Sequence, residues 1–447
     1  MKNDLFEKAP IHTAYLKLAI PVVLSMVVQL VYNMVDTYFI ALTRNTALVA
    51  GVSICTPLFT LFLAFGDMFG LGGSSVISRM LGAGKGNDVK RISAFCVYAS
   101  IVFGIIVTAV LLAGETPILL FLGADESTLS YAMQYYRYIV LGCTFIIFSL
   151  IPTNILRAVG HPNASMIASI MGAVINMVLD PIFIFGLGMG AKGAAIATII
   201  GYICSTSFSV WYIATKCDTL SVSIRDLKIS SAELGMIFAV GLPASVTNFT
   251  QTLGMTLTNR SLSVYGSDAI AVMGIVLKIV NIVMLVIVGL AFGGQPLTGY
   301  CYGAKNTERL KKVLAFAYKI VCGVGFVMAV VVALLANPLL HLFLSDSTLI
   351  DMGVIMLRLQ MPCMVLMGFG LVTICTFQSM GKGLPALILS ICRQGVVYAI
   401  VIALFSSLFG YNGVISAQLG SDVISFFIAI GLFVAVVKPV LQNKLNS

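Results

Sequence analysis

Apolar residues form long runs along this chain, and short polar connections separate them. A helix of about 20 apolar residues crosses the roughly 30 Å hydrocarbon core of a bilayer. The runs predict twelve membrane-spanning helices, at about residues 14–41, 48–76, 92–113, 129–153, 163–187, 193–215, 234–260, 268–295, 313–335, 352–377, 385–409 and 414–437. We therefore expect an all-α polytopic membrane protein embedded in a lipid bilayer.

The second half of the chain repeats the first after a shift of about 221 residues. The matched pairs include Gly72 with Gly293, Gly160 with Gly381, Asp125 with Asp346 and, after a slip of one residue, Pro21 with Pro243 and Gly190 with Gly410. Repeats with an even number of spans share one orientation, and a pseudo-two-fold axis along the membrane normal relates them. The repeat therefore predicts two six-helix lobes.

One long polar stretch, residues 216–233, separates the sixth predicted span from the seventh. It contains Lys216, Arg225 and Lys228, and the spans on either side of it are apolar. We therefore predict an N-lobe over residues 1–215, a cytoplasmic linker over 216–233 and a C-lobe over 234–447. No stretch is long and polar enough to form a soluble domain.

Lysine and arginine gather in alternate connections, and this placement predicts the topology. The clusters comprise Lys2, Lys8 and Lys17; Arg79, Lys85, Lys90 and Arg91; Arg157; the linker; Lys305, Arg309, Lys311 and Lys312; Lys382 and Arg393; and Lys438 and Lys444. Because basic connections stay in the cytoplasm, both termini should be cytoplasmic. The net charge of +9 then reflects orientation in a membrane, which we expect to be a bacterial inner membrane, and does not indicate nucleic-acid binding.

Composition excludes several other classes of protein. With 59% hydrophobic and 10% charged residues, the chain has more apolar surface than a soluble core of this length absorbs. Its ten cysteines are scattered and its three histidines are isolated, so we expect neither disulfides nor a metal cluster. The segment 82–86 lacks the first glycine and the Ser or Thr of a phosphate-binding loop. We therefore expect a monomer that is not an enzyme, has no cofactor and draws energy from an ion gradient or a partner.

Asp36 is the clearest candidate for chemistry, because ionisable groups inside membrane spans are costly and usually functional. Gln29, Tyr32 and Asn33 precede it by seven, four and three residues, so all four share one side of a helix. The matching region of the second half, around Thr258, has no acid. The alternative is a carboxylate at the outer end of the span, in contact with lipid headgroups.

Asp180 is the second candidate, and it follows Asn176 by one helical turn. Pro181 comes next, so the alternative is that the Asp-Pro pair only shapes the end of the helix. If both acids are buried in one lobe, each should raise the proton affinity of the other. The same oxygens, with an amide and a hydroxyl, also suit a hard cation such as sodium, so protons and sodium both remain open.

Other charged residues and two prolines admit more than one role. Asp67 and Asp422 lie near predicted span ends and are expected to be boundary residues. Lys278, in the middle of a span, is expected to oppose a carboxylate, bind an anionic substrate or extend to the interface. Pro21 and Pro243, at matched positions, either start their helices or kink them, and a kink there would change the shape of a cavity.

Several segments occur in a fixed order along the chain. They are Ala19-Ile20-Pro21 with Tyr32 and Asp36; residues 72–85; Arg157 to Pro162; Asn176 to Pro181 followed by Gly186 to Gly190; and Gly241-Leu242-Pro243. In this order, and with the duplication, they resemble the multidrug and toxic compound extrusion (MATE) family over almost the whole chain. Within the family, the chain resembles the DNA-damage-inducible-type branch.

The resemblance implies antiport, in which a proton or a sodium ion enters while a cationic or amphipathic compound leaves. It places the cation-coupling site, with possible sodium binding, on Asp36, Asn176, Asp180 and Thr198. Other branches of the family also have acids in spans 7 and 10, and this chain has none there. Coupling is therefore expected to run through the N-lobe.

The substrate needs a wider space, which we expect spans 1, 2, 7 and 8 to line. The candidate cavity residues are Gln29, Tyr32, Asn33, Gln251, Met255 and Lys278. The leading hypothesis is a secondary multidrug efflux antiporter. The alternative is a lipid-linked saccharide flippase or exporter, which would require a basic cavity. A channel would require a continuous polar path, whereas the polar residues here cluster in one lobe.

Overall fold

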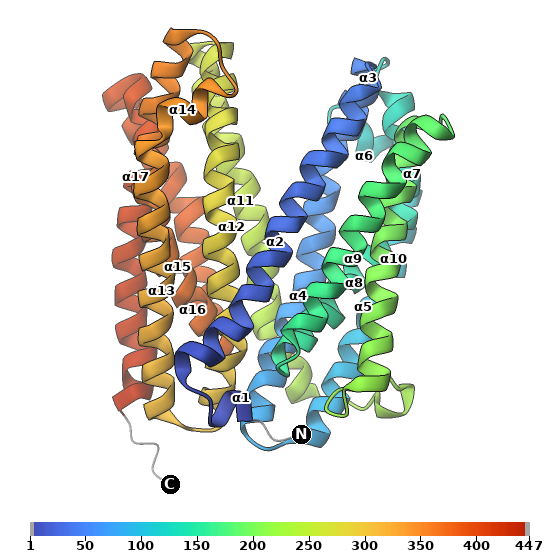
Figure 1. The fold of residues 1–447 in the computed structure, drawn as a ribbon, viewed down its shortest axis with the longest axis vertical. Helices are drawn as coiled ribbons and strands as arrows, with labels where there is room; N and C mark the ends of the chain where they lie inside the picture. The colour runs from blue at the N-terminus through green and yellow to red at the C-terminus, as the bar shows by residue number, and fades with distance from the viewer. Residues whose placement is uncertain (1–3, 443–447) are drawn as a thin grey trace. The chain divides into compact units, whose positions relative to one another are not determined.

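The structure, a computed structural model, describes residues 4–442, and every regular element in that range is a helix (Figure 1). Lys2 and Lys444, on which part of the topology prediction rests, lie outside the described residues. Within the described range, ten helices are long and apolar enough to cross a membrane. Leu129–Leu141 and Cys143–Ala158, bent by 45° at their junction, together make an eleventh span.

The last of these ten segments, Gly383–Gln442, contains two of the predicted spans. It is broken at Gly410, whose φ of 57° and ψ of −133° are not helical. Glycine tolerates a positive φ because it has no Cβ. Gly190, its match in the first half, begins a helix with a φ of 55°. With this break, the twelve-helix prediction is confirmed for the described residues.

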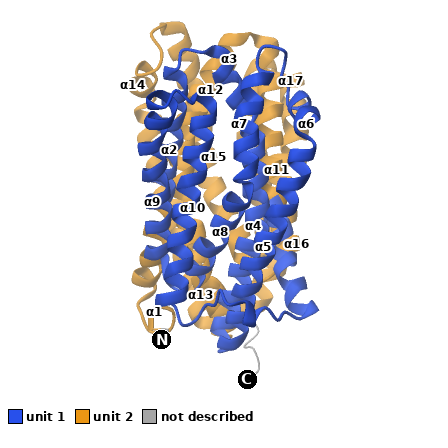
Figure 2. Cartoon of the chain, turned by 90° about the vertical axis from the view of Figure 1, so that its right-hand side faces the viewer, with its two compact units in different colours: residues 1–3, 24–245 blue, residues 4–23, 246–447 orange. Residues whose placement is uncertain are grey.

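The chain forms two compact units, and Figure 2 shows them in different colours. Unit 1 comprises residues 24–245, and unit 2 comprises residues 4–23 and 246–442 among those described. Helices α2 (Ile11–Leu42) and α11 (Ser231–Leu262) each pass from one unit to the other, at matched positions just after Pro21 and Pro243. The predicted lobes, 1–215 and 234–447, differ from the units because they keep each of these helices whole.

Close packing explains why the first part of each crossing helix groups with the other half of the chain. In unit 2, a Cβ at Gly293 would lie 2.3 Å from Ala19 Cα, and the Tyr15 hydroxyl donates to Leu290 O at 2.9 Å. In unit 1, a Cβ at Gly241 would lie 1.9 Å from Met68 O. Only glycine permits such backbone contact, so these contacts hold residues 11–23 in unit 2 and residues 231–245 in unit 1.

Unit 1 is a bundle of long helices around a core that includes Phe62, Ile139 and Ile147, all fully buried. Besides its parts of α2 and α11, its elements are α3 Thr46–Ile54, α4 Thr56–Gly82, α5 Gly86–Ala113, α6 Glu115–Phe121, α7 Leu129–Leu141, α8 Cys143–Ala158, α9 Pro162–Pro181, the π-helical turn η1 Ile182–Gly186, α10 Gly190–Lys216 and the 3-10 turn η2 Ile224–Asp226. Helix α8 packs against both α4 and α5, and α10 packs against α9.

Unit 2 has a parallel organisation. Besides its parts of α2 and α11, its elements are α1 Asp4–Glu7, the 3-10 turn η3 Ser263–Tyr265, α12 Ser267–Gly303, α13 Thr307–Leu334, α14 Ala336–His341, α15 Ser347–Ser379, α16 Gly383–Ile391, the π-helical turn η4 Cys392–Val396 and α17 Val397–Gln442. Helix α15 packs against α12, α13 and α17, as α8 packs against several helices of unit 1.

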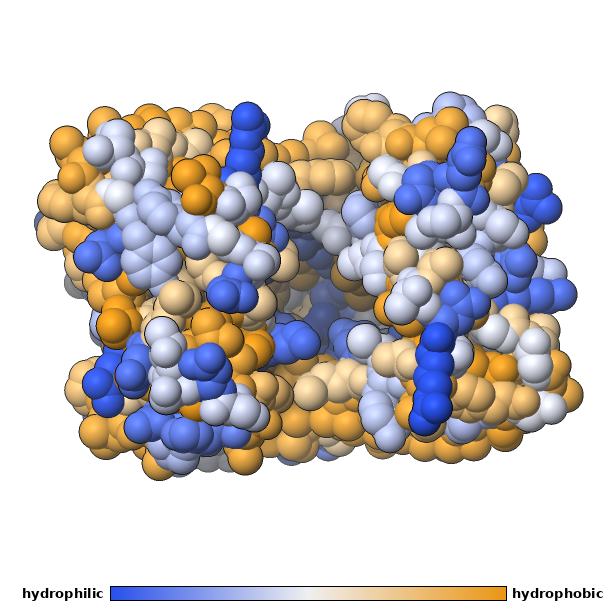
Figure 3. Space-filling view, turned by 90° about the horizontal axis from the view of Figure 1, so that it is seen from above, coloured by the Kyte–Doolittle hydropathy of each residue, from blue (hydrophilic) through white to orange (hydrophobic). Residues whose placement is uncertain are grey.

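The polar linker is folded onto unit 1. Arg91 of α5 pairs with Glu233 at 2.8 Å, and the Tyr98 hydroxyl donates to Val222 O at 2.9 Å. Large apolar side chains remain exposed along the helices, including Val110 (63%) and Phe427 (65%). Figure 3 shows one end of the molecule, where hydrophilic side chains gather among apolar ones, while hydrophobic side chains dominate the flanks, as a bilayer requires.

Candidate functional site

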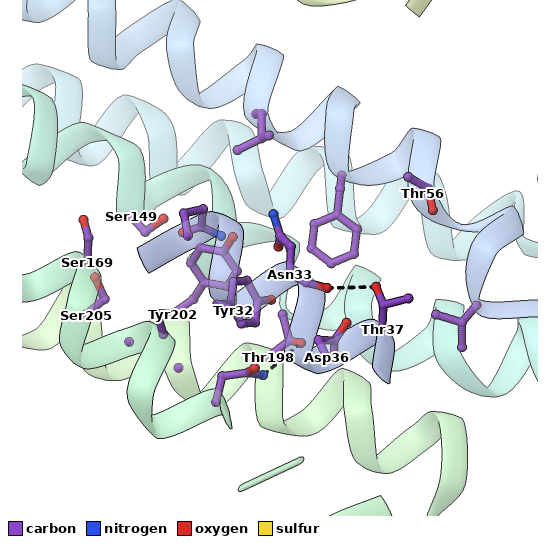
Figure 4. A pocket seen from close by; sticks show the side chains of 18 of the residues that line it. Tyr32, Asn33, Asp36, Thr37, Thr56, Ser149, Ser169, Thr198, Tyr202 and Ser205 are labelled. Carbon is purple, nitrogen blue, oxygen red and sulfur yellow. Dashed lines mark hydrogen bonds between the residues drawn. The ribbon is translucent and has the colours of Figure 1, made fainter. Parts of the chain in front are cut away.

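Unit 1 contains a polar cavity of about 530 Å³. Seven helices contribute to its walls, and Figure 4 shows many of the side chains that point into it. The polar lining residues are Gln29, Tyr32, Asn33, Asp36, Thr37, Ser53, Thr56, Tyr135, Ser149, Thr153, Ser169, Asn176, Thr198, Tyr202 and Ser205. So many polar groups inside an apolar bundle indicate a binding site, because burying them without a ligand or water is costly.

Helix α2 presents one polar face to this cavity. Gln29, Tyr32, Asn33 and Asp36 all line it, as their helical spacing predicts. The Asp36 side chain lines the cavity of unit 1 (Figure 4). This position favours a functional role for Asp36 over that of a boundary carboxylate in contact with headgroups.

Helices α9 and α10 hold the second acid. Asp180 is fully buried, and Asn176 lies one turn before it on α9. With its amide nitrogen facing the acid, Asn176 donates to Asp180 Oδ2 at 3.0 Å. The amide oxygen then accepts from Thr198 of α10, from the hydroxyl at 3.2 Å and from the backbone nitrogen at 2.9 Å. The three residues form one buried hydrogen-bonded network. The Asp-Pro pair therefore does more than shape the end of the helix.

The two acids meet inside unit 1. Asp36 and Asp180 lie close enough to interact electrostatically, and Tyr32 lies beside both. Two neighbouring carboxyl groups repel each other when both are ionised, so such a pair favours a shared proton or a bound cation. The structure thus places Asp36, Asn176, Asp180 and Thr198 together, as the resemblance implied.

One oxygen of this network has no partner. Asp36 Oδ1 is buried and makes no hydrogen bond within the described part of the chain. An unpaired buried carboxylate oxygen costs free energy and indicates a site for a ligand that donates a proton or carries positive charge. The oxygen atoms nearby that can ligate a cation belong to two carboxyl groups, an amide and a hydroxyl. Such all-oxygen sets suit a hard cation or a proton.

The cavity lining has no lysine, arginine or histidine among the described residues. Asp36 is its ionisable acid, and Tyr32, Tyr135 and Tyr202 add aromatic rings. A carboxylate attracts cations, and aromatic faces attract them through the ring quadrupole. The arrangement therefore suits a positively charged or amphipathic ligand better than an anionic one.

Two glycines keep this cavity open. Gly172 of α9 and Gly201 of α10 both line it, and a Cβ at Gly201 would lie only 2.6 Å from Gly172 O. The two helices therefore touch at backbone distance, which brings Asn176 and Thr198 close enough to bond. The absence of side chains here also leaves space beside the polar groups.

The other predicted cavity residues lie elsewhere. Gln251, Met255 and Lys278 belong to unit 2, are exposed and do not line the cavity of unit 1, so their role stays a prediction. Pro21 and Pro243 lie well inside α2 and α11, so they do not start their helices.

The boundary interpretation of two acids also requires correction. Asp422 is 2% exposed and pairs with Arg393. It lies inside α17, which continues well before and after it. Asp67 lies within α4, where it interacts electrostatically with Arg157. Neither acid is at the end of its helix.

Sequence reasoning missed several lining residues, including Ser169 and Gly172 of α9 and Tyr202 and Ser205 of α10. A signal for them exists. Ser169, Gly172 and Asn176 recur at intervals of three and four residues, as do Thr198, Gly201 and Ser205. Small and polar residues at helical spacing in apolar spans mark helix faces that pack closely or line a site.

Comparison with known proteins places this chain among membrane exporters. The family model described as MatE matches residues 21–182 and 243–402, one match in each half. The multidrug export protein MepA of Staphylococcus haemolyticus is 31% identical over 441 residues, which cover 99% of this chain and 96% of that protein. This relative is named as an export protein and not as an enzyme.

Solved structures agree with the sequence matches. A crystal structure of MATE in complex with MaL6 matches with a TM-score of 0.94 and 26% identity, over 99% of this chain and all of the other. An outward-facing multidrug resistance MATE family transporter of the MOP superfamily matches with a TM-score of 0.92 and 27% identity, over 99% of each chain.

Proposed function

The chain belongs to the multidrug and toxic compound extrusion (MATE) family, and we propose that it is a multidrug efflux antiporter coupled through the acids of unit 1. It exports cationic or amphipathic compounds, while protons or sodium ions move inward. The observation that carries this proposal is the pair Asp36 and Asp180 beside a polar cavity, with one oxygen of Asp36 unpaired.

The same network can hold either coupling ion. With a proton, one of the two neighbouring carboxyl groups is neutral, which relieves the repulsion between Asp36 and Asp180, and Asn176 donates to Asp180. With sodium, both carboxyl groups are ionised, and their oxygens bind the ion together with those of Asn176 and Thr198. Both forms neutralise part of the buried negative charge, and each arranges the hydrogen bonds differently.

Asp36 and the cavity residues Gln29 and Asn33 lie on the same face of α2. A change in the protonation or ion contacts of Asp36 therefore acts on the wall that contacts the drug. Pro21 removes a backbone donor inside α2, where the helix passes between the units, and so provides a point of bending. Ion binding that favours one helix shape then drives release of the drug.

Thermodynamic linkage constrains this scheme. If the ion weakens drug binding by some factor, the drug must weaken ion binding by the same factor. Typical coupling of this kind is about 5-fold to 150-fold in affinity. The drug and the ion need not occupy the same atoms, because the cavity is larger than the ion site.

The saccharide flippase hypothesis finds less support in the cavity. A pyrophosphate-linked substrate requires basic groups, and none lines the described cavity. Lys278, the residue that favoured this hypothesis, is an exposed residue of unit 2.

Orientation and location complete the proposal. Residues 4 and 442 both belong to unit 2, and α1 and the end of α17 lie at the same end of it (Figure 1). An even number of spans produces this arrangement. We place that end in the cytoplasm by the positive-inside rule, and the protein in a bacterial inner membrane as a monomer.

Flux measurements on purified protein in liposomes test the proposal. Export of ethidium, a fluorescent amphipathic cation, is followed while a sodium gradient and a pH gradient are imposed separately. We expect one of the two gradients to drive ethidium movement, and ethidium affinity to fall as that ion rises. If ethidium binding and transport depend on neither sodium nor pH, the coupling mechanism is wrong.

A further inference from the structure

A buried ion pair lies inside unit 2. Arg393 of η4 donates its Nε to Asp422 Oδ1 of α17 at 2.8 Å, and the two side chains are 13% and 1% exposed. Gln418 donates its Nε2 to the other carboxylate oxygen, Oδ2, at 3.1 Å. Both oxygens of Asp422 therefore have partners, whereas Asp36 in unit 1 has an unpaired oxygen.

The internal repeat relates this ion pair to the cavity of unit 1. The shift of 221 residues places Gly172 on Arg393, and the shift of 220 that matches Gly190 with Gly410 places Tyr202 on Asp422. Both Gly172 and Tyr202 line the cavity. Charged side chains that pair with each other thus stand in unit 2 where cavity-lining residues stand in unit 1.

Local geometry supports this register. In unit 1, a Cβ at Gly201 would lie 2.6 Å from Gly172 O. Ser421 matches Gly201 in the second half, and its hydroxyl donates to Arg393 O at 2.9 Å. The corresponding pairs of helices therefore approach each other at matched positions in the two units. In unit 2 the side chain of Ser421 lies at this approach.

Among the described groups that interact with Asp422, Arg393 is the one that carries a positive charge. The Cys363 thiol of α15 interacts with Asp422, and so does the Tyr398 hydroxyl of α17. Neither is a cation. A buried carboxylate without a counter-charge is strongly unfavourable, and removal of one member of a buried pair leaves the other uncompensated.

We propose that Arg393 is a built-in counter-ion for Asp422, so that Asp422 binds no exchangeable cation and unit 2 takes no part in ion coupling. The inference rests on the proposed function, because it assigns coupling to unit 1 alone. Its prediction is specific: loss of the guanidinium should convert Asp422 into a second cation site.

Carboxyl titration tests this directly. Infrared spectra and ²²Na⁺ binding are measured for purified Asp36→Asn/Arg393→Gln protein, in which unit 1 has lost its cavity acid. We expect one additional carboxyl group that titrates with pH or binds sodium, relative to Asp36→Asn alone. The extra signal should disappear when Asp422→Asn is added. Arg393→Lys, which keeps the charge, should add no signal.

A second arm uses the otherwise unchanged protein. Arg393→Gln/Asp422→Asn replaces the ion pair by a neutral polar pair, and we expect its ion dependence of ethidium export to stay within about twofold of wild type. A folded double variant with altered ion dependence would overturn the inference. So would a folded Asp36→Asn/Arg393→Gln protein without the extra carboxyl signal.

The two arms also separate this inference from the proposed function. If wild-type export ignores both ions, the proposed function fails, yet the infrared arm still decides whether Asp422 becomes a cation site. If Arg393→Gln prevents folding, the double variant and Arg393→Lys still carry the test, because both avoid an uncompensated buried acid.

Discussion

The two repeats of this chain have the same helices and different polar interiors. The first repeat has Asp36 on its crossing helix, and the second has Thr258 at the matched position, where it bonds the Tyr398 hydroxyl. The first has Asp180 inside, and the second has Val401 there. Duplication therefore preserved the scaffold, while substitution at a few buried positions decided which repeat holds an accessible acid.

The comparison also shows two ways to bury a carboxylate. In the proposed mechanism, Asp36 and Asp180 rely on each other, on Asn176 and on an exchangeable proton or ion. Asp422 relies on a neighbouring arginine that cannot leave. Only the first arrangement can respond to an ion gradient, because a response requires that the partner comes and goes.

The largest effect should follow from loss of the cavity acid. We predict that Asp36→Asn abolishes ion-driven ethidium export, because it removes the charge that binds the coupling ion. Thr258→Ala, at the matched position of the second repeat, should keep most of the activity. Liposome flux at equal amounts of reconstituted protein checks both. Near-wild-type export by Asp36→Asn would refute the assignment.

Asp180→Asn should impair coupling almost as strongly, since Asp180 interacts electrostatically with Asp36 and accepts a hydrogen bond from Asn176. We expect at least about a tenfold loss of export, equivalent to roughly 1.4 kcal/mol. Val401→Ala, the matched change in unit 2, tests whether loss of a buried side chain alone has this effect. Equal losses in the two variants would show that packing, and not the acid, is responsible.

Exchange of the matched small residues should produce a smaller effect. Gly201→Ser copies the second repeat into the first, and its Cβ would meet Gly172 O, so α9 and α10 must separate. We expect weaker ethidium binding and a lower melting temperature. Ser421→Gly should lose one hydrogen bond, worth about 1 kcal/mol, and leave export unchanged. If Gly201→Ser binds ethidium normally, the close approach does not shape the cavity.

The smallest effect concerns the turn around Asp125, which the repeat matches with the turn around Asp346. Hydrogen bonds from Ser127 and then Thr128 lower the pKa of Asp125, which is outside the membrane spans, to about 2. The ionised form therefore stabilises the fold above the unfolded pKa of about 3.9, and this contribution disappears as pH falls towards 2. Asp125→Asn should be slightly less stable than wild type at pH 6, and the difference should shrink below pH 4.

Melting curves in detergent across this pH range check the turn prediction. Asp346→Asn is the matched control in the second repeat. The Asp346 carboxylate accepts from Thr348 N at 2.7 Å, whereas Asp125 Oδ1 accepts four hydrogen bonds. Asp346→Asn should therefore lower stability less at pH 6. A difference between Asp125→Asn and wild type that grows on acidification would contradict the sign of the effect.

Sequence analysis was most successful where a property is local or periodic. Helical spacing correctly predicted that Gln29, Tyr32, Asn33 and Asp36 share a face, because α2 is continuous through them. It was wrong about Asp422, because an acid near the edge of an apolar run looks the same whether or not a distant residue pairs with it. The lining residues of α9 and α10 had a periodic signal, but periodicity does not reveal which face points to a cavity.

The amino-acid sequence by itself determined the apolar spans, the duplication and the presence of two acids in the first half, since these follow from hydropathy and spacing. Only the tertiary structure decided that Asp36 and Asp180, 144 positions apart in the chain, lie close enough to interact electrostatically. It also decided that α2 and α11 divide between the units, and that Arg393 satisfies Asp422. Each of these depends on packing between helices distant in sequence, where backbone contact at glycine and the partners of buried charges are settled together.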